Sequence, residues 1–87
     1  MADTINHVYD GYAERLRVIA PHLKEIDYQI CYLSKIGLRD VEISGLIQKT
    51  ESAVQMRKNH IRNILKLQKQ TNFNNELDKL VYNQNSK

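Results

Sequence analysis

The chain of 87 residues has the length of one small domain with a single hydrophobic core. Its single cysteine, Cys31, excludes an internal disulfide framework, and no apolar run approaches the ~20 residues that a membrane-spanning helix needs. The net charge of +3 is concentrated between residues 39 and 70, where seven Lys and Arg accompany three Asp and Glu, and this excess predicts an anionic partner there.

The first predicted helix covers residues 3–19, within a leading segment at 1–22. Gly11 lies inside this helix and costs it roughly 1 kcal/mol relative to Ala. Pro21 is expected to end it, because the residue before a proline is pushed out of the helical conformation. Apolar side chains recur at helical spacing at Ile5, Val8, Tyr9, Tyr12, Leu16 and Ile19.

Two more helices are predicted at about residues 23–36 and 39–47. Gly37 supplies the left-handed residue that closes many helices, and Asp40 is expected to cap the start of the next one. The inner face of the first of the two carries Leu23, Ile26, Ile30, Leu33 and Ile36, and the apolar positions of the second are Val41, Ile43, Leu46 and Ile47.

The fourth predicted helix, at residues 50–68, has three distinct surfaces. Thr50 can cap its start, because a hydroxyl there accepts an otherwise unpaired backbone N–H. Val54, Ile61 and Leu65 share its apolar side. The opposite side carries Ser52, Gln55, Met56, Asn59, His60 and Asn63. A helix that is apolar behind, amide-rich in front and basic along its length suits the major groove of DNA, although a solvated basic helix is the simpler alternative.

A short closing helix is predicted from Phe73 to about Tyr82, with a frayed tail after it. No alternating β-branched run is long enough to predict a strand. We therefore expect an all-α protein, a small five-helix bundle in one domain at 1–87, with a central core at 23–68 and a closing helix and tail at 69–87.

The helices at 40–47 and 50–68, with their short link, have the dimensions of a helix-turn-helix. Two helices that cross steeply after a tight turn approach closely at one point, so the residue there must be small, and Ser44 is small. Val54 is the expected apolar anchor of the second helix, with Ile43 and Ile47 buried in the first.

A gap-free pattern of residue types supports this interpretation over residues 23–67. Its positions are Leu23, Asp27, Ile30, Leu33, Gly37, Leu38, Glu42, Ile43, Ser44, Ile47, Thr50, Val54, Arg57, Ile61 and Leu65. In this register the chain resembles the helix-turn-helix domain of LuxR-type bacterial transcription regulators. The family pattern has other residue types at Lys24, Ile26, Ala53 and Gln55. These departures remove a helix cap and contacts to phosphates or bases, so they predict weaker DNA binding rather than another fold.

The resemblance implies sequence-specific binding of double-stranded DNA in transcription regulation. It places Gln55, Met56 and Asn59 at base-facing positions. Gln and Asn can pair with adenine and Met can pack on a thymine methyl group, so we expect a preference for A·T-containing sites. Phosphate contacts are expected from Lys49, Thr50, Ser52, Arg57, Lys58 and Arg62. As alternatives, Thr50 acts only as a cap, and Arg57 and Lys58 lay their stems along the edge of the core.

Nothing in the sequence indicates catalysis, a cofactor or a metal site. His7, His22 and His60 lack ligand spacing with one another and with Cys31. The acidic residues that stand two apart point to different helix faces, so they form no catalytic pair. We expect a protein that is not an enzyme.

The expected partner is DNA, bound by a homodimer on two half-sites and joined through the last helix or the edge that carries Leu67. A sensor domain does not fit in this length, so the input signal is expected from an additional regulatory domain or partner protein. The polar N-terminus is unlike a signal peptide, so we expect a cytoplasmic protein with no membrane contact. Two alternatives share the fold: a helical protein-interaction module that has lost DNA contact, and a sigma-factor-like promoter-binding domain.

Overall fold

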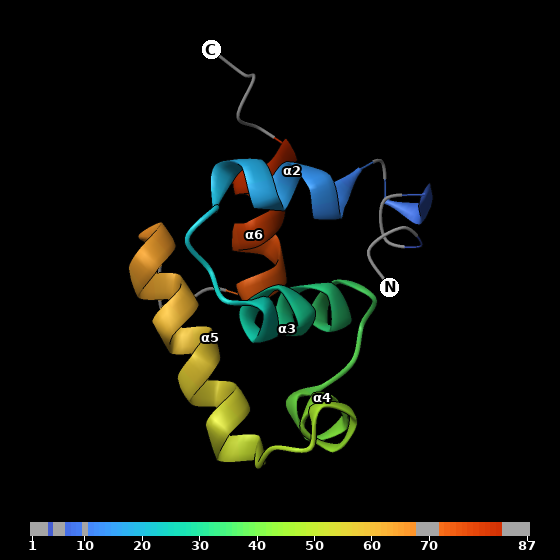
Figure 1. Ribbon diagram of the computed structural model, residues 1–87, viewed down its shortest axis with the longest axis vertical. Helices are drawn as coiled ribbons and strands as arrows, with labels where there is room; N and C mark the ends of the chain where they lie inside the picture. Colours follow the sequence, from blue (N-terminus) through green and yellow to red (C-terminus); the bar gives the residue numbers. More distant parts are fainter. Residues whose placement is uncertain (1–3, 5–6, 10, 68–71, 83–87) are drawn as a thin grey trace.

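The computed structural model of the protein describes residues 4, 7–9, 11–67 and 72–82 (Figure 1). These residues form five helices with defined bounds and no strand, so the predicted all-α class is confirmed for them. The helices are α2 (Tyr12–Ile19), α3 (Glu25–Lys35), α4 (Asp40–Ile47), α5 (Glu51–Leu65) and α6 (Phe73–Tyr82). Within these residues, no helix is both long enough and apolar enough to cross a lipid bilayer.

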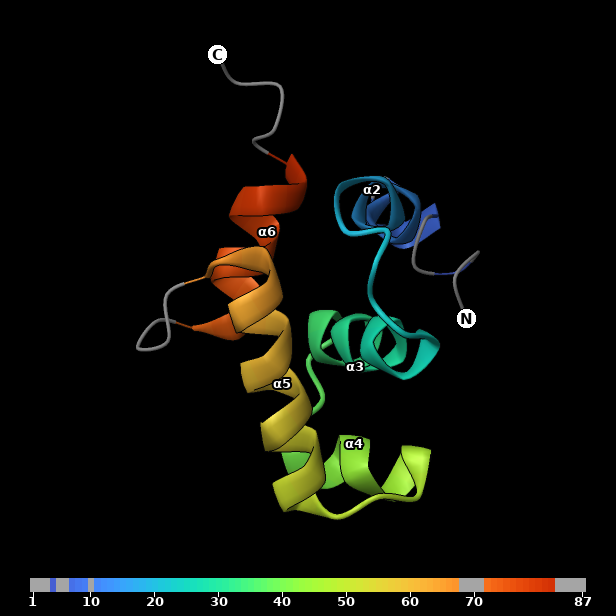
Figure 2. The ribbon, with the colours of Figure 1, turned by 60° about the vertical axis from the view of Figure 1, so that its left-hand side comes forward.

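The five helices are arranged around α3. Figures 1 and 2 show α2, α3 and α4 stacked in this order, with α5 and α6 running along one side of the stack. The central helix α3 packs against each of the other four, and α4 packs most extensively against α5. The helix α5 therefore packs mainly against α3 and α4.

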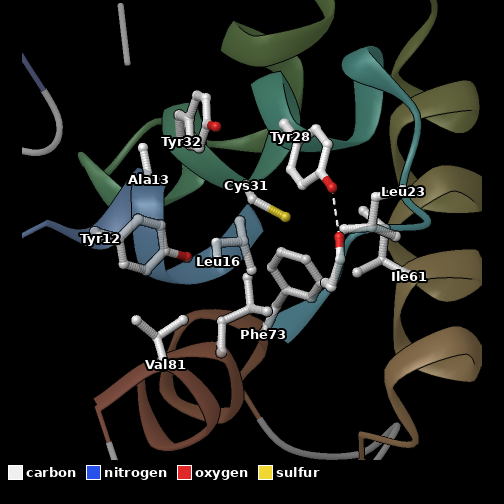
Figure 3. Packing of buried hydrophobic residues seen from close by; sticks show 12 residues of the cluster. Tyr12, Ala13, Leu16, Leu23, Tyr28, Cys31, Tyr32, Ile61, Phe73 and Val81 are labelled. Atoms are coloured by element: carbon white, nitrogen blue, oxygen red, sulfur yellow. Dashed lines mark hydrogen bonds between the residues drawn. The ribbon is translucent and has the colours of Figure 1, made fainter. Parts of the chain in front are cut away.

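Two hydrophobic clusters hold this arrangement together. The larger one joins α2, α3, α5 and α6, and it includes Tyr12, Leu16, Cys31, Tyr32, Ile61, Phe73, Leu77 and Val81 (Figure 3). The smaller one consists of Ile30, Leu33, Ile43 and Val54, from α3, α4 and α5. Because α3 and α5 each contribute to both clusters, together they connect α4 to the rest of the bundle.

Two predicted helix ends are confirmed by their hydrogen bonds. The Thr50 hydroxyl accepts the backbone N–H of Ala53 at 3.0 Å and so caps the start of α5. Gly37 has a φ of 103° and follows α3, and the N–H of Leu38 reaches back to the carbonyl of Leu33 at 3.1 Å. This pairing satisfies carbonyls that the end of a helix leaves open.

The predicted helix at 3–19 is interrupted at Gly11: the described residues 4, 7 and 8 are helical, but they do not form one continuous helix with α2. The helix α2 begins only at Tyr12, and Gly11 before it has a left-handed backbone with a φ of 73°. A left-handed residue cannot continue a right-handed helix, and Gly adopts this conformation without a steric penalty. Residues 1–3, 5, 6 and 10 lie outside the described part of the chain.

Three further boundaries differ from the sequence-based expectation. The helix predicted from residue 23 begins at Glu25. Asp40 is the first residue of α4 rather than its cap: Arg39 holds the cap position, and its N–H donates to the carboxylate of Glu42 at 2.8 Å. The helix predicted to reach residue 68 ends at Leu65, since Lys66 has a left-handed backbone with a φ of 58°. Residues 68–71 and the tail at 83–87 are outside the described residues.

Three apolar side chains of the predicted helical pattern are exposed, among them Ile36, which was expected on an inner face. They are Ile36, Val41 and Leu46, at or beyond the ends of α3 and on α4. The helix α4 lies at one end of the stack, so α3 and α5 cover only the side that carries Ile43 and Ser44 (Figure 2).

Candidate functional site

The most distinctive feature of the structure is the α4–α5 pair. A turn at residues 48–50 separates the two helices, and Figure 2 shows α4 lying across the lower end of α5. Gln48 makes the turn with a left-handed backbone, at φ 59° and ψ 44°. The N–H of Lys49 donates to the carbonyl of Ser44 at 2.9 Å, so the chain reverses over the last turn of α4.

Packing between the two helices follows the sequence-based expectation. Ser44 is buried, and its hydroxyl donates to the carbonyl of Val41 at 2.7 Å. Ile43 and Val54 are completely buried against Ile30 and other residues of α3. The anchor roles of Ile43 and Val54 are therefore confirmed, and Ile47 is half-buried at the edge of the same cluster.

The face of α5 that points away from the core is exposed and polar. Gln55, Met56 and Asn59 all lie on the surface, and Met56 is 71% exposed. An open groove of about 320 Å³ runs along this face, lined by Met56, Arg57, Asn59, His60 and Asn63. The three residues predicted to face bases thus share one accessible helix face, which we name the outer face of α5.

Three of the six predicted phosphate contacts have partners within the protein. The guanidinium of Arg57 donates to both carboxylate oxygens of Asp27, at 2.8 and 2.7 Å. Lys58 pairs with Asp40 at 2.5 Å and is mostly buried. Arg62 donates to the Asn59 side chain at 3.2 Å. The sequence does not indicate these pairs. Because Asp27 neutralises Arg57 and Asp40 neutralises Lys58, both cations are less available to a phosphate than expected.

The other three predicted phosphate contacts, Lys49, Thr50 and Ser52, are exposed. They surround the first turn of α5, where helix N–H groups favour a negative charge. Thr50 serves as a cap, as the alternative interpretation holds, and its hydroxyl oxygen accepts from Ala53. Its O–H still has a proton to donate, because a hydroxyl is both donor and acceptor.

Asp27 is the residue that sequence reasoning missed as a structural partner. It is 1% exposed, although it carries a carboxylate. A buried charge is costly unless it is paired and hydrogen-bonded. Asp27 follows Leu23 by four residues and precedes Ile30 by three, so it lies on the inner face of α3. An acidic residue at an inner position indicates a buried basic partner.

A larger polar cavity adjoins the outer face of α5. It has a volume of about 520 Å³ and lies between α3, α5 and the start of α6. Its lining includes Ser34, Gln55, Lys58, Asn59 and Asn74. Ser34 and Asn74 bond to each other at 2.6 and 2.7 Å, so they hold α3 and α6 together across this cavity.

The thiol of Cys31 and the phenol of Tyr12 are both shielded from solvent. Cys31 is fully buried, and burial raises the pKa of its thiol to about 12. Burial likewise raises the pKa of the Tyr12 phenol. Among residues 4, 7–9, 11–67 and 72–82, no three His, Cys, Asp or Glu side chains are placed to hold a metal ion.

Comparison of the chain with protein-family models, with curated proteins and with solved structures gives no match. The geometry of the α4–α5 pair is therefore the basis for a functional interpretation.

Proposed function

We propose that the protein is a LuxR-like helix-turn-helix domain of a bacterial transcription regulator, and that α5 binds in the major groove of double-stranded DNA. The observation that carries the proposal is the outer face of α5, where Gln55, Met56 and Asn59 are exposed side by side on a helix that α3 and α4 hold in place. The major groove admits an α-helix, and its base edges present donors, acceptors and thymine methyl groups that these side chains complement.

The charges near this face support binding at a modest affinity. Lys49 is exposed at the start of α5 and is available to a phosphate. Arg57 and Lys58 are already paired with carboxylates, so each contributes less to the attraction of DNA than a free cation does. A single copy should therefore bind weakly at physiological salt, and a homodimer on two half-sites would supply the missing affinity.

The experiment that tests this proposal begins with selection of DNA sites from a random pool by the wild-type chain. We expect A·T-containing sites. Replacement of Gln55→Ala or Asn59→Ala should then weaken binding to the selected site by roughly 5- to 150-fold, because a bidentate contact to a base contributes about 1–3 kcal/mol. Both side chains are exposed, so the thermal unfolding of these variants should match that of the wild type.

A matched control is Asn75→Ala, which removes the same exposed amide from α6. Its DNA affinity should equal that of the wild type. Recovery of sites without A·T pairs, or equal losses for Asn59→Ala and Asn75→Ala, would contradict base reading by the outer face of α5.

A helical protein-interaction module is the second candidate function. The observation in its favour is the internal pairing of Arg57 and Lys58, which leaves the outer face of α5 neutral around a Met56 that is 71% exposed. Exposed Met is common at surfaces that bind other proteins. Absence of DNA binding at low salt would favour this module over the DNA-binding domain.

A further inference from the structure

The Arg57 side chain contacts a buried carboxylate and also lines a groove on the protein surface. Its Nε and Nη2 atoms donate to the two oxygens of Asp27, which is 1% exposed. A guanidinium has five N–H donors, so three remain after these two bonds. The Arg57 side chain is 28% exposed and lines the groove on the outer face of α5. One edge of the fork is therefore held in the core, and the side chain as a whole is partly exposed in the groove that Met56 and Asn59 also line.

The carboxylate that holds Arg57 is itself fixed. Asp27 lies in the first turn of α3, and its Oδ2 also accepts the backbone N–H of Lys24 at 3.2 Å. A carboxylate bonded to the backbone of its own helix cannot follow an arginine that swings outward. The pair of Arg17 and Glu25 differs, because its carboxylate is not buried: the two side chains are 43% and 66% exposed.

We propose that Asp27 is a positioning residue that holds Arg57 so that the outward edge of its guanidinium binds a DNA phosphate beside the base-facing side chains. This inference rests on the proposed function. An arginine that is already immobilised loses little conformational entropy when it binds, so its contact to phosphate is stronger and better oriented than that of a free side chain. The charges of Arg57 and Asp27 nearly cancel, so the pair adds little to the long-range attraction of DNA. Its contribution is to fix the orientation of the phosphate contact.

The test is a charge-balanced double variant, Asp27→Asn with Arg57→Gln. It keeps the net charge at +3, keeps side chains of similar size and leaves no buried charge without a partner. If Arg57 binds phosphate, affinity for the DNA site selected by the wild type should fall about tenfold or more, because hydrogen bonds to charged groups are the strong ones. If the pair only fastens α3 to α5, a folded double variant should bind within twofold of the wild type, and the proposal is overturned.

A second readout identifies the contact itself. Ethylation of individual phosphates in the selected site should show positions at which the modification weakens wild-type binding. One of these positions should lose its effect in the double variant. A uniform loss of affinity with every sensitive phosphate retained would show damage to the fold rather than a missing contact, and it would also overturn the proposal.

The single variant Asp27→Asn separates positioning from charge. It raises the net charge from +3 to +4, so electrostatics alone predicts tighter binding to any DNA. The positioning role predicts weaker binding to the selected site and a smaller ratio between selected and random DNA. An unchanged or larger ratio contradicts it.

The matched control is Arg17→Gln with Glu25→Gln, which neutralises another arginine–carboxylate pair without changing the net charge. It should bind DNA as the wild type does. If the wild type itself binds no DNA, the proposed function fails before any variant is compared, so the two failures are distinguishable.

Discussion

Arg57 and Asp27 stand 30 residues apart in the sequence, yet they form a bidentate ion pair of 2.8 and 2.7 Å that fastens α5 to α3. The pair lies beside the small cluster that contains Ile30 and Val54. Hydrophobic contacts press α5 against the core, and the ion pair fixes its rotation about its own axis, because only one face of the helix can present Arg57 to Asp27. That rotation decides which side chains form the outer face.

Loss of Arg57 should therefore destabilise the fold. Arg57→Ala leaves the Asp27 carboxylate buried without its charged partner, and this arrangement typically costs about 3–5 kcal/mol. The free energy of unfolding in urea measures the effect. Lys79→Ala is the control, because Lys79 is 69% exposed and pairs with Glu76 of its own helix, so its loss should cost less than about 1 kcal/mol. Equal losses for the two variants would show that the buried pair does not hold α5.

Adjacent positions of α4 should respond oppositely to a larger side chain. Ser44 is buried against α5, so Ser44→Leu should cost roughly 1–3 kcal/mol through overpacking. A Cβ added at Gly45 would meet no described atom beyond its neighbours and the backbone of α4 within 4 Å, and Gly45 lies in the helix interior. Gly45→Ala should therefore stabilise the protein by about 1 kcal/mol. Urea unfolding again provides the measurement. A tolerated leucine at position 44 would mean that the two helices do not approach closely there.

The left-handed residues at the ends of α4 and α5 predict stabilising changes. Gln48 and Lys66 have φ angles of 59° and 58°, a conformation that costs a residue with a Cβ roughly 1–2 kcal/mol. Gln48→Gly and Lys66→Gly should each raise the melting temperature, with a gain below that cost because glycine loses more entropy on folding. Gly37→Ala should do the reverse, since Gly37 has a φ of 103°. A lower melting temperature for both glycine variants would contradict these turn conformations.

Stability should decline at alkaline pH, beginning with Cys31. Burial raises the pKa of its thiol from 9.0 to about 12, so the folded protein keeps the proton that the unfolded chain releases. This contribution is fully present below pH 9.0 and is lost between pH 9.0 and about 12, at up to about 1.4 kcal/mol per pH unit. Tyr12 and Tyr32, whose pKa values burial also raises, add a decline above pH 10.0.

Urea unfolding between pH 7 and 11 measures this effect. In Cys31→Ala the decline should begin about one pH unit higher, when the tyrosines of the unfolded chain start to ionise. An identical pH profile for wild type and variant would mean that the thiol is not shielded in the folded state.

The sequence predicted what depends on local spacing. The apolar positions of α3, α4, α5 and α6 recur every three or four residues, and the cap at Thr50 and the stop at Gly37 are single-residue signals. Gly11 could not be placed in this way, because a glycine inside a periodic pattern is compatible with either a continuous helix or a break. The structure decides between these alternatives in favour of a break.

The candidate site was only partly predictable. The exposure of Met56 and Asn59 follows from their position on the side of the helix away from Val54, and Gln55 lies at the flank of that side. The partners of Arg57 and Lys58 depend on how α5 docks on α3 and on the start of α4, and helical periodicity carries no information about contacts between distant helices. A basic residue on a helix margin therefore looks the same in sequence whether it faces solvent or a buried carboxylate.

Binding of DNA through α5 is the hypothesis on which every other functional inference depends, and a salt-dependent titration of the wild-type chain and Lys49→Ala with duplex DNA decides it. We expect binding at low salt that weakens as salt rises, and a log–log slope that is flatter by about 0.9 for Lys49→Ala because one phosphate contact is lost. No detectable binding at low salt, or a salt slope that Lys49→Ala leaves unchanged while Lys79→Ala flattens it, would refute DNA binding by this helix.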